Sequence, residues 1–286
     1  MGILAISISS ILVRWAQQEG VHSLAIAAWR VAIAGMFLVL LPKQRSAPER
    51  VSLSPSTWVW TVLAGSLLAV HFAAWVVALE STSIALCTVL LATNPLWVAI
   101  LAAVVLRERS SPTTWTGIGI AFSAIAAQSF LSLQGRSAQH AGVGNWLALT
   151  SALSFAGYIL VGRHLRVQLS LGKYFAAVTL VAASLLVANC LLWGIALSGY
   201  SAKAWMCLAA LALVSHLVGH GALNWAARRM QATAVAMATL GEPAGAALLA
   251  WLLLGEVAGA GELTVMALIL AGIALVLWGA RHSEVP

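Results

Sequence analysis

Two formally charged side chains, Glu242 and Arg30, lie deep within apolar stretches of this 286-residue sequence. A charge at the centre of a membrane helix costs about 2.5–3.5 kcal/mol on insertion scales, so such groups usually face a cavity or a partner. We therefore expect Glu242 either to line a cavity, as a proton-sensitive or amine-binding group, or to form a structural pair with Arg30. Arg30 itself is interpreted as a structural residue.

The sequence around Glu242 repeats an earlier part of the chain at an offset of 148 residues. Four anchors keep this spacing: Ile11-Leu12-Val13 with Ile159-Leu160-Val161, Pro95 with Pro243, Leu106 with Leu254, and Glu108 with Glu256. The repeat places Asn94 at the position equivalent to Glu242. Asparagine offers both donors and an acceptor without charge, so this asymmetric pair favours a zwitterionic ligand. Glu108 and Glu256 are expected at membrane edges, in capping or loop-pairing roles.

Histidines and aromatic residues supply further candidates. His71 and Trp75 share one helical face, and His216, His220 and Asn224 form a second stripe with the same spacing. His216 with His220 resembles half of a zinc site, but no third ligand recurs nearby, and we expect no metal. Lining a polar cavity and buried hydrogen bonding are the two other interpretations. The candidate substrate-binding residues are His71, Trp75, Asn94, Trp97, Tyr158, His220 and Glu242.

Pro95 and Pro243 are expected near the middle of their membrane spans. A proline removes one hydrogen bond within a helix and frees a carbonyl, which is tolerable only where protein or water satisfies that group. Gly241 and Gly245 flank Pro243 and should loosen its helix further. Because both copies of the repeat carry the proline, we predict hinges that line a cavity. A packing kink is the alternative.

The composition argues against a soluble protein. Hydrophobic residues make up 62% and charged residues 8%, against about 25% charged in soluble domains. The net charge of +7 comes from 15 Lys and Arg scattered over loops, which indicates topology signals rather than a nucleic-acid site. The cysteines lie in apolar stretches without ligand-like spacing and are interpreted as core residues: Cys87, Cys190 and Cys207.

About 20 apolar residues cross a bilayer as a helix, and no β-barrel alternation is visible. The apolar runs predict ten transmembrane helices, near 2–16, 23–41, 57–79, 83–106, 113–132, 143–162, 174–197, 203–225, 232–254 and 260–280. The first run lacks a basic start and a cleavage site, so it is interpreted as a span rather than a signal peptide. It is short, which suggests that a few native residues precede Met1.

The predicted fold is all-α and integral to the membrane, with five-helix repeats at 1–135 and 141–282. Eleven basic residues lie on the loops after even-numbered spans or at the C-terminus: Lys43, Arg45, Arg50, Arg107, Arg109, Arg163, Arg166, Lys173, Arg228, Arg229 and Arg281. Three lie on the opposite side: Arg14, Arg136 and Lys203. Both termini are therefore expected on the cytoplasmic side of a bacterial inner membrane. Five spans per half give the halves opposite orientations, so the repeat is predicted to be inverted.

The block from Asn94-Pro95-Leu96-Trp97 through Leu106-Arg107-Glu108 to Trp115-Thr116-Gly117 resembles the signature of EamA-type transporters, in the drug/metabolite transporter superfamily. The stretch from Glu242-Pro243 to Leu254-Gly255-Glu256 is similar. The resemblance covers essentially the whole chain and implies ten helices, five plus five inverted, around a cavity formed mainly by spans 1–4 and 6–9. Within this family, the chain most resembles bacterial exporters of aromatic and other amino acids.

These features favour an exporter of small metabolites, most of all amino acids including aromatic ones, by alternating access around a central cavity. The alternatives are another cargo (a nucleotide sugar, a purine or a cationic drug) or an intramembrane enzyme. GxSxG and HExxH motifs and aspartate are missing from the sequence, which disfavours an enzyme. The expected partners are an amino acid and the lipid bilayer, without cofactor or nucleic acid. The small-residue run Gly119, Ser123, Ala127 predicts close helix packing, either within the chain or in a homodimer.

Overall fold

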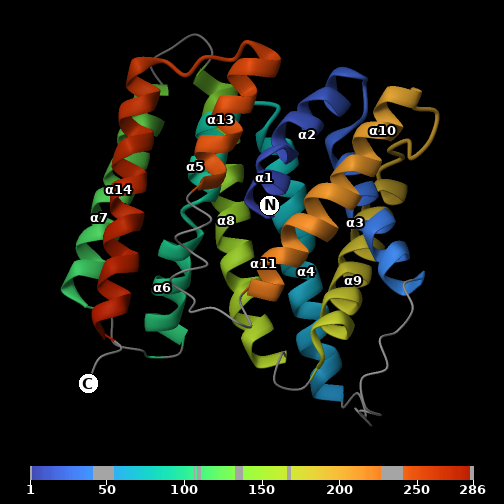
Figure 1. Ribbon diagram of the computed structural model, residues 1–286, viewed down its shortest axis with the longest axis horizontal. Helices are drawn as coiled ribbons and strands as arrows, with labels where there is room; N and C mark the ends of the chain where they lie inside the picture. Colours follow the sequence, from blue (N-terminus) through green and yellow to red (C-terminus); the bar gives the residue numbers. More distant parts are fainter. Residues whose placement is uncertain are drawn as a thin grey trace.

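The computed structural model describes residues 2–40, 55–105, 107, 111–132, 138–165, 169–226 and 241–283, and every regular element within them is helical (Figure 1). The helices are α1 (Gly2–Ser7), α2 (Ser9–Gln18), α3 (Ser23–Leu40), α4 (Pro55–Ala78), α5 (Ile84–Leu91), α6 (Asn94–Val105), α7 (Pro112–Ser132), α8 (Ala138–Leu165), α9 (Leu171–Leu192), α10 (Ala202–Ala210), η1 (Leu211–His220), α11 (Gly221–Ala226), α13 (Gly241–Leu254) and α14 (Ala260–Ser283). Several residues used above for topology lie outside the described residues: Lys43, Arg45, Arg50, Glu108, Arg109, Arg136, Arg166, Arg228 and Arg229.

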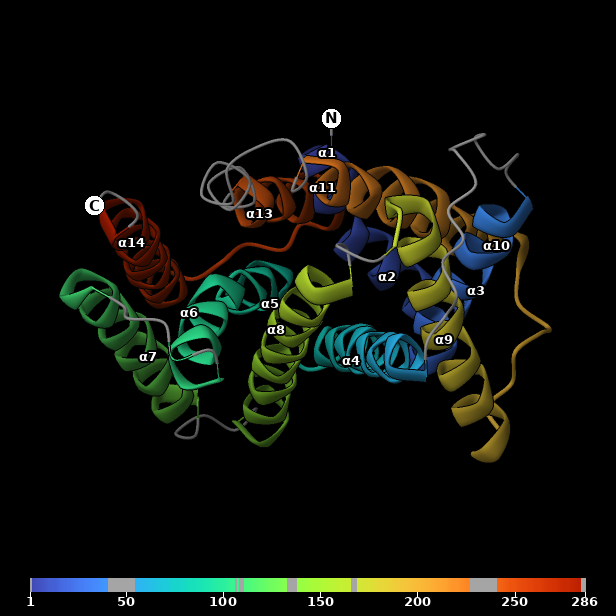
Figure 2. The ribbon, with the colours of Figure 1, turned by 90° about the horizontal axis from the view of Figure 1, so that it is seen from below.

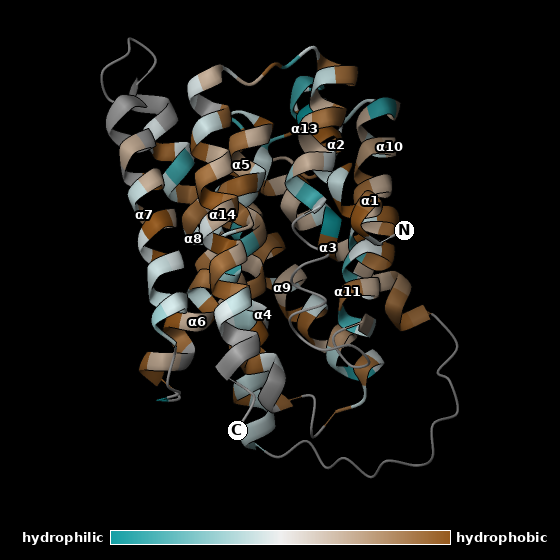
Figure 3. Cartoon of the chain, turned by 60° about the vertical axis from the view of Figure 1, so that its left-hand side comes forward, coloured by the Kyte–Doolittle hydropathy of each residue, from teal (hydrophilic) through white to brown (hydrophobic). Residues whose placement is uncertain are grey.

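The described helices are those of a membrane protein. Six segments of the described part of the chain are long and apolar enough to cross a bilayer: Ser23–Leu40, Pro55–Ala78, Ile84–Val105, Gly142–Gly162, Leu171–Leu192 and Ala202–Ala226. Large apolar side chains face outward, such as Leu40, Val104 and Leu192, which are 80%, 70% and 84% exposed. Hydrophobic residues run along the length of the helices in Figure 3. Apolar surface of this extent is suited to contact with lipid, so the chain is a multi-pass membrane protein, as its composition predicts.

Helix ends agree with the predicted spans to within a few residues in most places. α3 and α7 begin and end within one residue of the predicted 23–41 and 113–132. α9 ends at Leu192 rather than at 197, because Gly194 adopts a left-handed conformation (φ +65°) and turns the chain. The predicted ninth span starts at 232, whereas the described part of it begins with α13 at Gly241.

Two predicted spans are divided into shorter helices. The first is divided at Ile8, into α1 and α2. The fourth is divided at residues 92–93, where the Thr93 hydroxyl donates to the Leu90 carbonyl at 2.6 Å. Pro95 therefore lies mid-span but in the first turn of α6, where its missing N–H breaks no hydrogen bond of that helix. The sequence predicted that Pro95 lies within one continuous helix, whereas the structure has it at the start of a second one.

One helix changes its type in the middle. The chain is helical from Ala202 to Ala226, and its ten central residues, η1, form a π-helix. π-helical segments are rare and occur frequently at functional sites. η1 carries both His216 and His220 as buried residues, so this irregular segment positions two of the side chains singled out in the sequence.

Helices at equivalent places in the repeat have equivalent neighbours. A shift of 148 residues carries α3 onto α9 and α7 onto α14, and the members of each pair pack against each other. Figures 1 and 2 show α7 and α14 side by side. The same shift carries α4 onto α10 and η1, and it relates α8 to α1 and α2. α4 packs on α8, and correspondingly α10 packs on α2 and η1 packs on α1. Both copies of the repeat thus contribute to one interlocked bundle.

Glycines set the distance between α7 and α14. A Cβ at Gly117 would lie 2.5 Å from the carbonyl oxygen of Gly272, and a Cβ at Gly272 would lie 2.6 Å from that of Gly117. The predicted run of Gly119, Ser123 and Ala127 is exposed instead, and a Cβ at Gly119 would meet no atom within 4 Å. The contact within the chain is therefore made by Gly117 and not by that run, and the homodimer stays a prediction.

Replacing Gly117 with valine is expected to force α7 and α14 apart and to lower the melting temperature of the purified protein by several degrees, because overpacking a tight contact costs about 1–3 kcal/mol. Gly119→Val is the matched control, since it adds the same side chain to the same helix in open space. Thermal unfolding in detergent, followed by size-exclusion chromatography, measures both variants. Equal melting temperatures would contradict the close contact between these helices.

Candidate functional site

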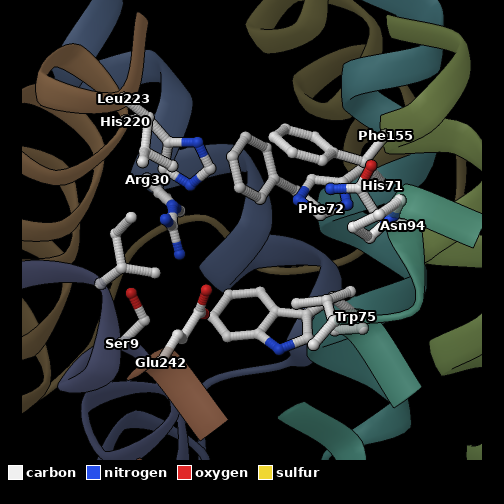
Figure 4. Close-up of a pocket in the computed structure, with 14 residues that line it drawn as sticks. Ser9, Arg30, His71, Phe72, Trp75, Asn94, Phe155, His220, Leu223 and Glu242 are labelled. Carbon is white, nitrogen blue, oxygen red and sulfur yellow. The ribbon is translucent and has the colours of Figure 1, made fainter. Parts of the chain in front are cut away.

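A cavity of about 60 Å³ lies within the bundle and is lined by both halves of the chain (Figure 4). Its lining residues are Ile6, Ser9, Arg30, His71, Phe72, Trp75, Leu91, Ala92, Asn94, Pro95, Phe155, His220, Leu223 and Glu242. Common ligand pockets enclose roughly 300–1,000 Å³. A ligand the size of an amino acid therefore requires these walls to move apart.

The cavity brings together most of the residues predicted to bind substrate. Five of the seven line it: His71, Trp75, Asn94, His220 and Glu242. They come from α4, α6, η1 and α13, which are far apart in the sequence. Of the two predicted hinge residues, Pro95 is part of the lining, whereas Pro243 is buried directly after Glu242 and is not among the described lining residues.

Trp97 and Tyr158 are placed elsewhere and are not among the described residues that line the cavity. Trp97 packs edge-to-face on Phe122, with ring centroids 5.0 Å apart. Tyr158 stacks on Phe155 with centroids 5.5 Å apart, and on Tyr174 at 6.1 Å. Because Phe155 is itself a lining residue, Tyr158 supports the wall rather than forming its surface.

Arg30 is a charged lining residue that the sequence interpretation treated as structural. Its side chain is 1% exposed, and Cζ lies 4.4 Å from the ring centroid of Phe72 and 5.1 Å from that of Trp75. These cation–π contacts stabilise the charge within an apolar wall. They use none of its hydrogen-bond donors, and both Nε and Nη1 lack a hydrogen-bond partner. A buried donor without a partner costs about 1–3 kcal/mol, so Arg30 is poised to meet an acceptor.

Glu242 occupies the wall opposite Arg30. It is the second residue of α13, and its carboxylate and the guanidinium point toward one another in Figure 4. The first turn of a helix favours a carboxylate, because its free N–H groups carry partial positive charge. The two side chains attract each other through their opposite charges. Even so, Nε and Nη1 of Arg30 still have no hydrogen-bond partner.

His71 is held in one tautomer by Ser151 of α8. Ser151 Oγ donates to the His71 carbonyl at 2.8 Å, and Nδ1 of the ring lies 2.8 Å from that Oγ and 3.1 Å from the Ser151 carbonyl oxygen. The hydroxyl proton is already used, and a carbonyl oxygen only accepts, so Nδ1 must carry the ring proton. Neutral His71 thus has Nε2 as its hydrogen-bond acceptor.

The two histidines of η1 have different surroundings. His220 is a lining residue whose ring lies 5.5 Å from that of Phe72. His216 lies deeper, stacked on Phe175 at 5.2 Å, with Nε2 3.3 Å from Thr179 Oγ1. Within the described part of the chain, no group of three or more His, Cys, Asp or Glu side chains is placed to hold a metal ion. The histidine stripe therefore contributes one ring to the cavity and one to the packing behind it.

The sequence also matches a known protein family, and this match has the same two halves as the structure. The model of the EamA-like transporter family matches the sequence twice, over residues 1–130 and 142–278. The chain belongs to this family. A solved structure described as "Crystal structure of protein" matches with a TM-score of 0.68 and 19% sequence identity, over 99% of this chain and 97% of that chain, which shows the fold alone. No curated protein matches the sequence.

Membership in the EamA-like transporter family makes the protein a membrane transporter of small molecules. It confirms the resemblance inferred from the two copies of the proline and glutamate pattern. The cavity is thus the natural candidate for the substrate site of a transporter, since such sites lie between repeats.

At one end of this EamA-like transporter, a carboxylate joins the two halves. Gly255 ends α13 in a left-handed conformation, with φ +67°. The following residue, Glu256, accepts a hydrogen bond from the N–H of Ile84 at 2.5 Å, and its other carboxylate oxygen lies 3.8 Å from Arg14 Nη2. Arg14 also donates to the Thr82 carbonyl at 3.2 Å. Glu256 therefore caps α5 and pairs with Arg14 of α2, which is the capping part of the role expected for it.

A second polar contact joins α2 to the start of α10 at the same end of the bundle, uppermost in Figure 1. Lys203 Nζ donates to Glu19 Oε1 at 2.8 Å, and Ser201 Oγ donates to Oε2 at 2.7 Å. These hydrogen bonds, that of Lys203 first, hold the pKa of Glu19 below its ordinary value. Charged contacts thus join the two halves at this end.

Proposed function

We propose that this protein exports amino acids, including aromatic ones, across a bacterial inner membrane. The observation that carries the proposal is the mixed lining of the cavity, where the Glu242 carboxylate shares one cavity with the rings of Phe72, Trp75 and Phe155. A carboxylate is a strong partner for an ammonium group, and aromatic rings stack on aromatic cargo. Asn94 adds neutral donors and an acceptor at the same cavity.

The proposed architecture has ten transmembrane helices in two inverted five-helix repeats, at 1–135 and 141–282, with both termini in the cytoplasm. Its support is the eleven-to-three distribution of basic residues in the sequence, the double match to the family model, and the equivalent helix contacts of the two copies. Inverted repeats permit alternating access, because one half can rock against the other around a fixed site.

The proposed transport cycle needs both ends of the bundle to open in turn. Opening the end where Glu256 joins the two halves requires its separation from Arg14 and from the N–H of Ile84. The break between α5 and α6, next to the lining residue Pro95, gives the chain a place to bend beside the cavity. The cavity of about 60 Å³ would then expand to admit cargo.

Transport in membrane vesicles tests the proposal. Inside-out vesicles that contain the protein are expected to accumulate labelled tryptophan, phenylalanine and alanine, whereas vesicles without it are not. Trp75→Ala should reduce tryptophan transport more than alanine transport, because it removes stacking surface from the cavity. Trp97→Ala is the matched control, since its ring packs on Phe122 instead.

The same assay with labelled nucleotide sugar, purine and cationic drug separates the cargo classes. Accumulation of one of these without any amino acid would overturn the amino-acid proposal. Accumulation of amino acids in right-side-out vesicles alone would overturn the direction of transport but not the cargo.

A further inference from the structure

We propose that Arg30 binds the carboxylate group of the cargo. This inference rests on the proposed function and deepens it, because it assigns the second charged group of an amino acid to a residue. Arg30 lies in the middle of α3 and is 1% exposed, with its guanidinium pointing into the cavity toward Glu242 (Figure 4). Nε and Nη1 are themselves buried and have no hydrogen-bond partner in the protein.

The surroundings of Arg30 hold the guanidinium in place without using its donors. The rings of Phe72 and Trp75 flank it, with Cζ 4.4 Å and 5.1 Å from their centroids. Stacked rings restrict the planar group but leave its N–H bonds free at the edges. A planar guanidinium fixed in this way matches a carboxylate, which accepts two parallel hydrogen bonds from it. A purely structural arginine would instead direct these donors at protein oxygens.

Glu242 narrows the class of anion that this subsite accepts. A dianionic phosphate at Arg30 would lie opposite the negative charge of Glu242, which opposes its binding. An amine without a carboxylate would satisfy Glu242 but leave the Arg30 donors unpaired. A zwitterion satisfies both walls at once, with its carboxylate at Arg30 and its ammonium group at Glu242. The geometry therefore selects α-amino acids over simple amines and over phosphorylated metabolites.

Three related ligands separate the two charged subsites. Tryptophan carries both charges, tryptophanamide lacks the carboxylate, and indole-3-propionate lacks the ammonium group. Their affinities for the purified protein are measured in detergent by competition against labelled tryptophan, and by direct binding of each ligand. The wild type is expected to bind tryptophan about 10- to 100-fold more tightly than tryptophanamide, as is typical for loss of a charged hydrogen bond.

Arg30→Gln is expected to abolish this preference. Tryptophan binding should weaken about 10- to 100-fold, while tryptophanamide binding changes by less than about threefold. Glu242→Gln is the mirror control, since it should weaken tryptophan and tryptophanamide but not indole-3-propionate. A folded Arg30→Gln protein that keeps the wild-type ratio of the tryptophan and tryptophanamide affinities would overturn the proposal.

Arg30→Lys keeps the test decisive if the glutamine variant does not fold. Lysine retains the charge beside Phe72 and Trp75 but has no planar fork, so the preference for tryptophan over tryptophanamide should fall by about tenfold. An unchanged preference in Arg30→Lys would overturn the proposal. Wild-type protein that binds indole-3-propionate but not tryptophan would refute amino-acid cargo and support the carboxylate subsite. Wild-type protein that transports amino acids yet binds tryptophan and tryptophanamide equally would refute the subsite alone, and binding of none of the three would refute both.

Discussion

Glu242→Gln is expected to weaken amino-acid binding by about 10- to 100-fold and to remove any pH dependence of transport. Glutamine keeps the size and hydrogen-bonding capacity of the side chain, but it offers no charge to an ammonium group and no proton to exchange. The effect should be large because Glu242 lies on the cavity, opposite the buried Arg30. Affinity and initial transport rate, each measured over a series of pH values, provide the test.

Glu19→Gln is the matched control for this variant. It neutralises a carboxylate that pairs with Lys203 at the end of the bundle and is not among the described lining residues, so affinity should not change. If Glu242 is instead only a structural partner of Arg30, Glu242→Gln would lower expression and thermal stability without changing substrate preference. A folded variant with wild-type affinity and a wild-type pH profile would exclude Glu242 from the site.

Pro95→Ala is expected to slow transport about tenfold while leaving affinity nearly unchanged, because it shifts the balance between conformations rather than removing a binding group. Pro95 cannot donate to the Leu91 carbonyl, and α5 and α6 are separate at this point. Alanine restores that N–H and permits one continuous, straighter helix. Single-turnover transport and equilibrium binding, measured on the same preparation, separate rate from affinity.

Pro112→Ala serves as the control, since Pro112 begins α7 and is exposed outside the cavity. It should change neither quantity. Pro243→Ala is expected to act like Pro95→Ala, because the repeat places both prolines at equivalent positions. A loss of affinity with an unchanged transport rate would show that these prolines do not act as hinges.

The sequence was informative where a residue type is costly at its position. A carboxylate in an apolar run must be compensated, and this argument gave Glu242 two possible roles, in the lining of a cavity or in a pair with Arg30. In the structure Glu242 lines a cavity. The repeat then identified Asn94, and the four-residue spacing identified His71 with Trp75; all three line the same cavity. The same cost applies to Arg30, which lies mid-helix in α3 and also lines the cavity, a position that the sequence interpretation did not give it.

Other features depend on packing that no local pattern encodes. Trp97 and Tyr158 have the residue types of a binding site, but neighbouring helices place their rings against Phe122 and Phe155. The break at Ile8 has no proline or glycine to mark it. The π-helix η1 likewise has an ordinary apolar sequence, with no local signal for its type, and it packs against α1 and α3. Which helices pair was beyond the reach of hydropathy alone.

The cap on α5 has a consequence for how the protein is made. The N–H of Ile84 and the carboxylate of Glu256 are separated by 172 residues, so α5 is synthesised long before its acceptor exists. α7 is similarly synthesised well before its partner α14, which it contacts through Gly117 and Gly272. Bringing together residues so far apart in the chain has an entropic cost. This cost is offset only when the second half packs against the first. The first half is therefore expected to wait in the bilayer as an unfinished unit, with open surfaces that membrane chaperones or insertion machinery must protect until the second half arrives.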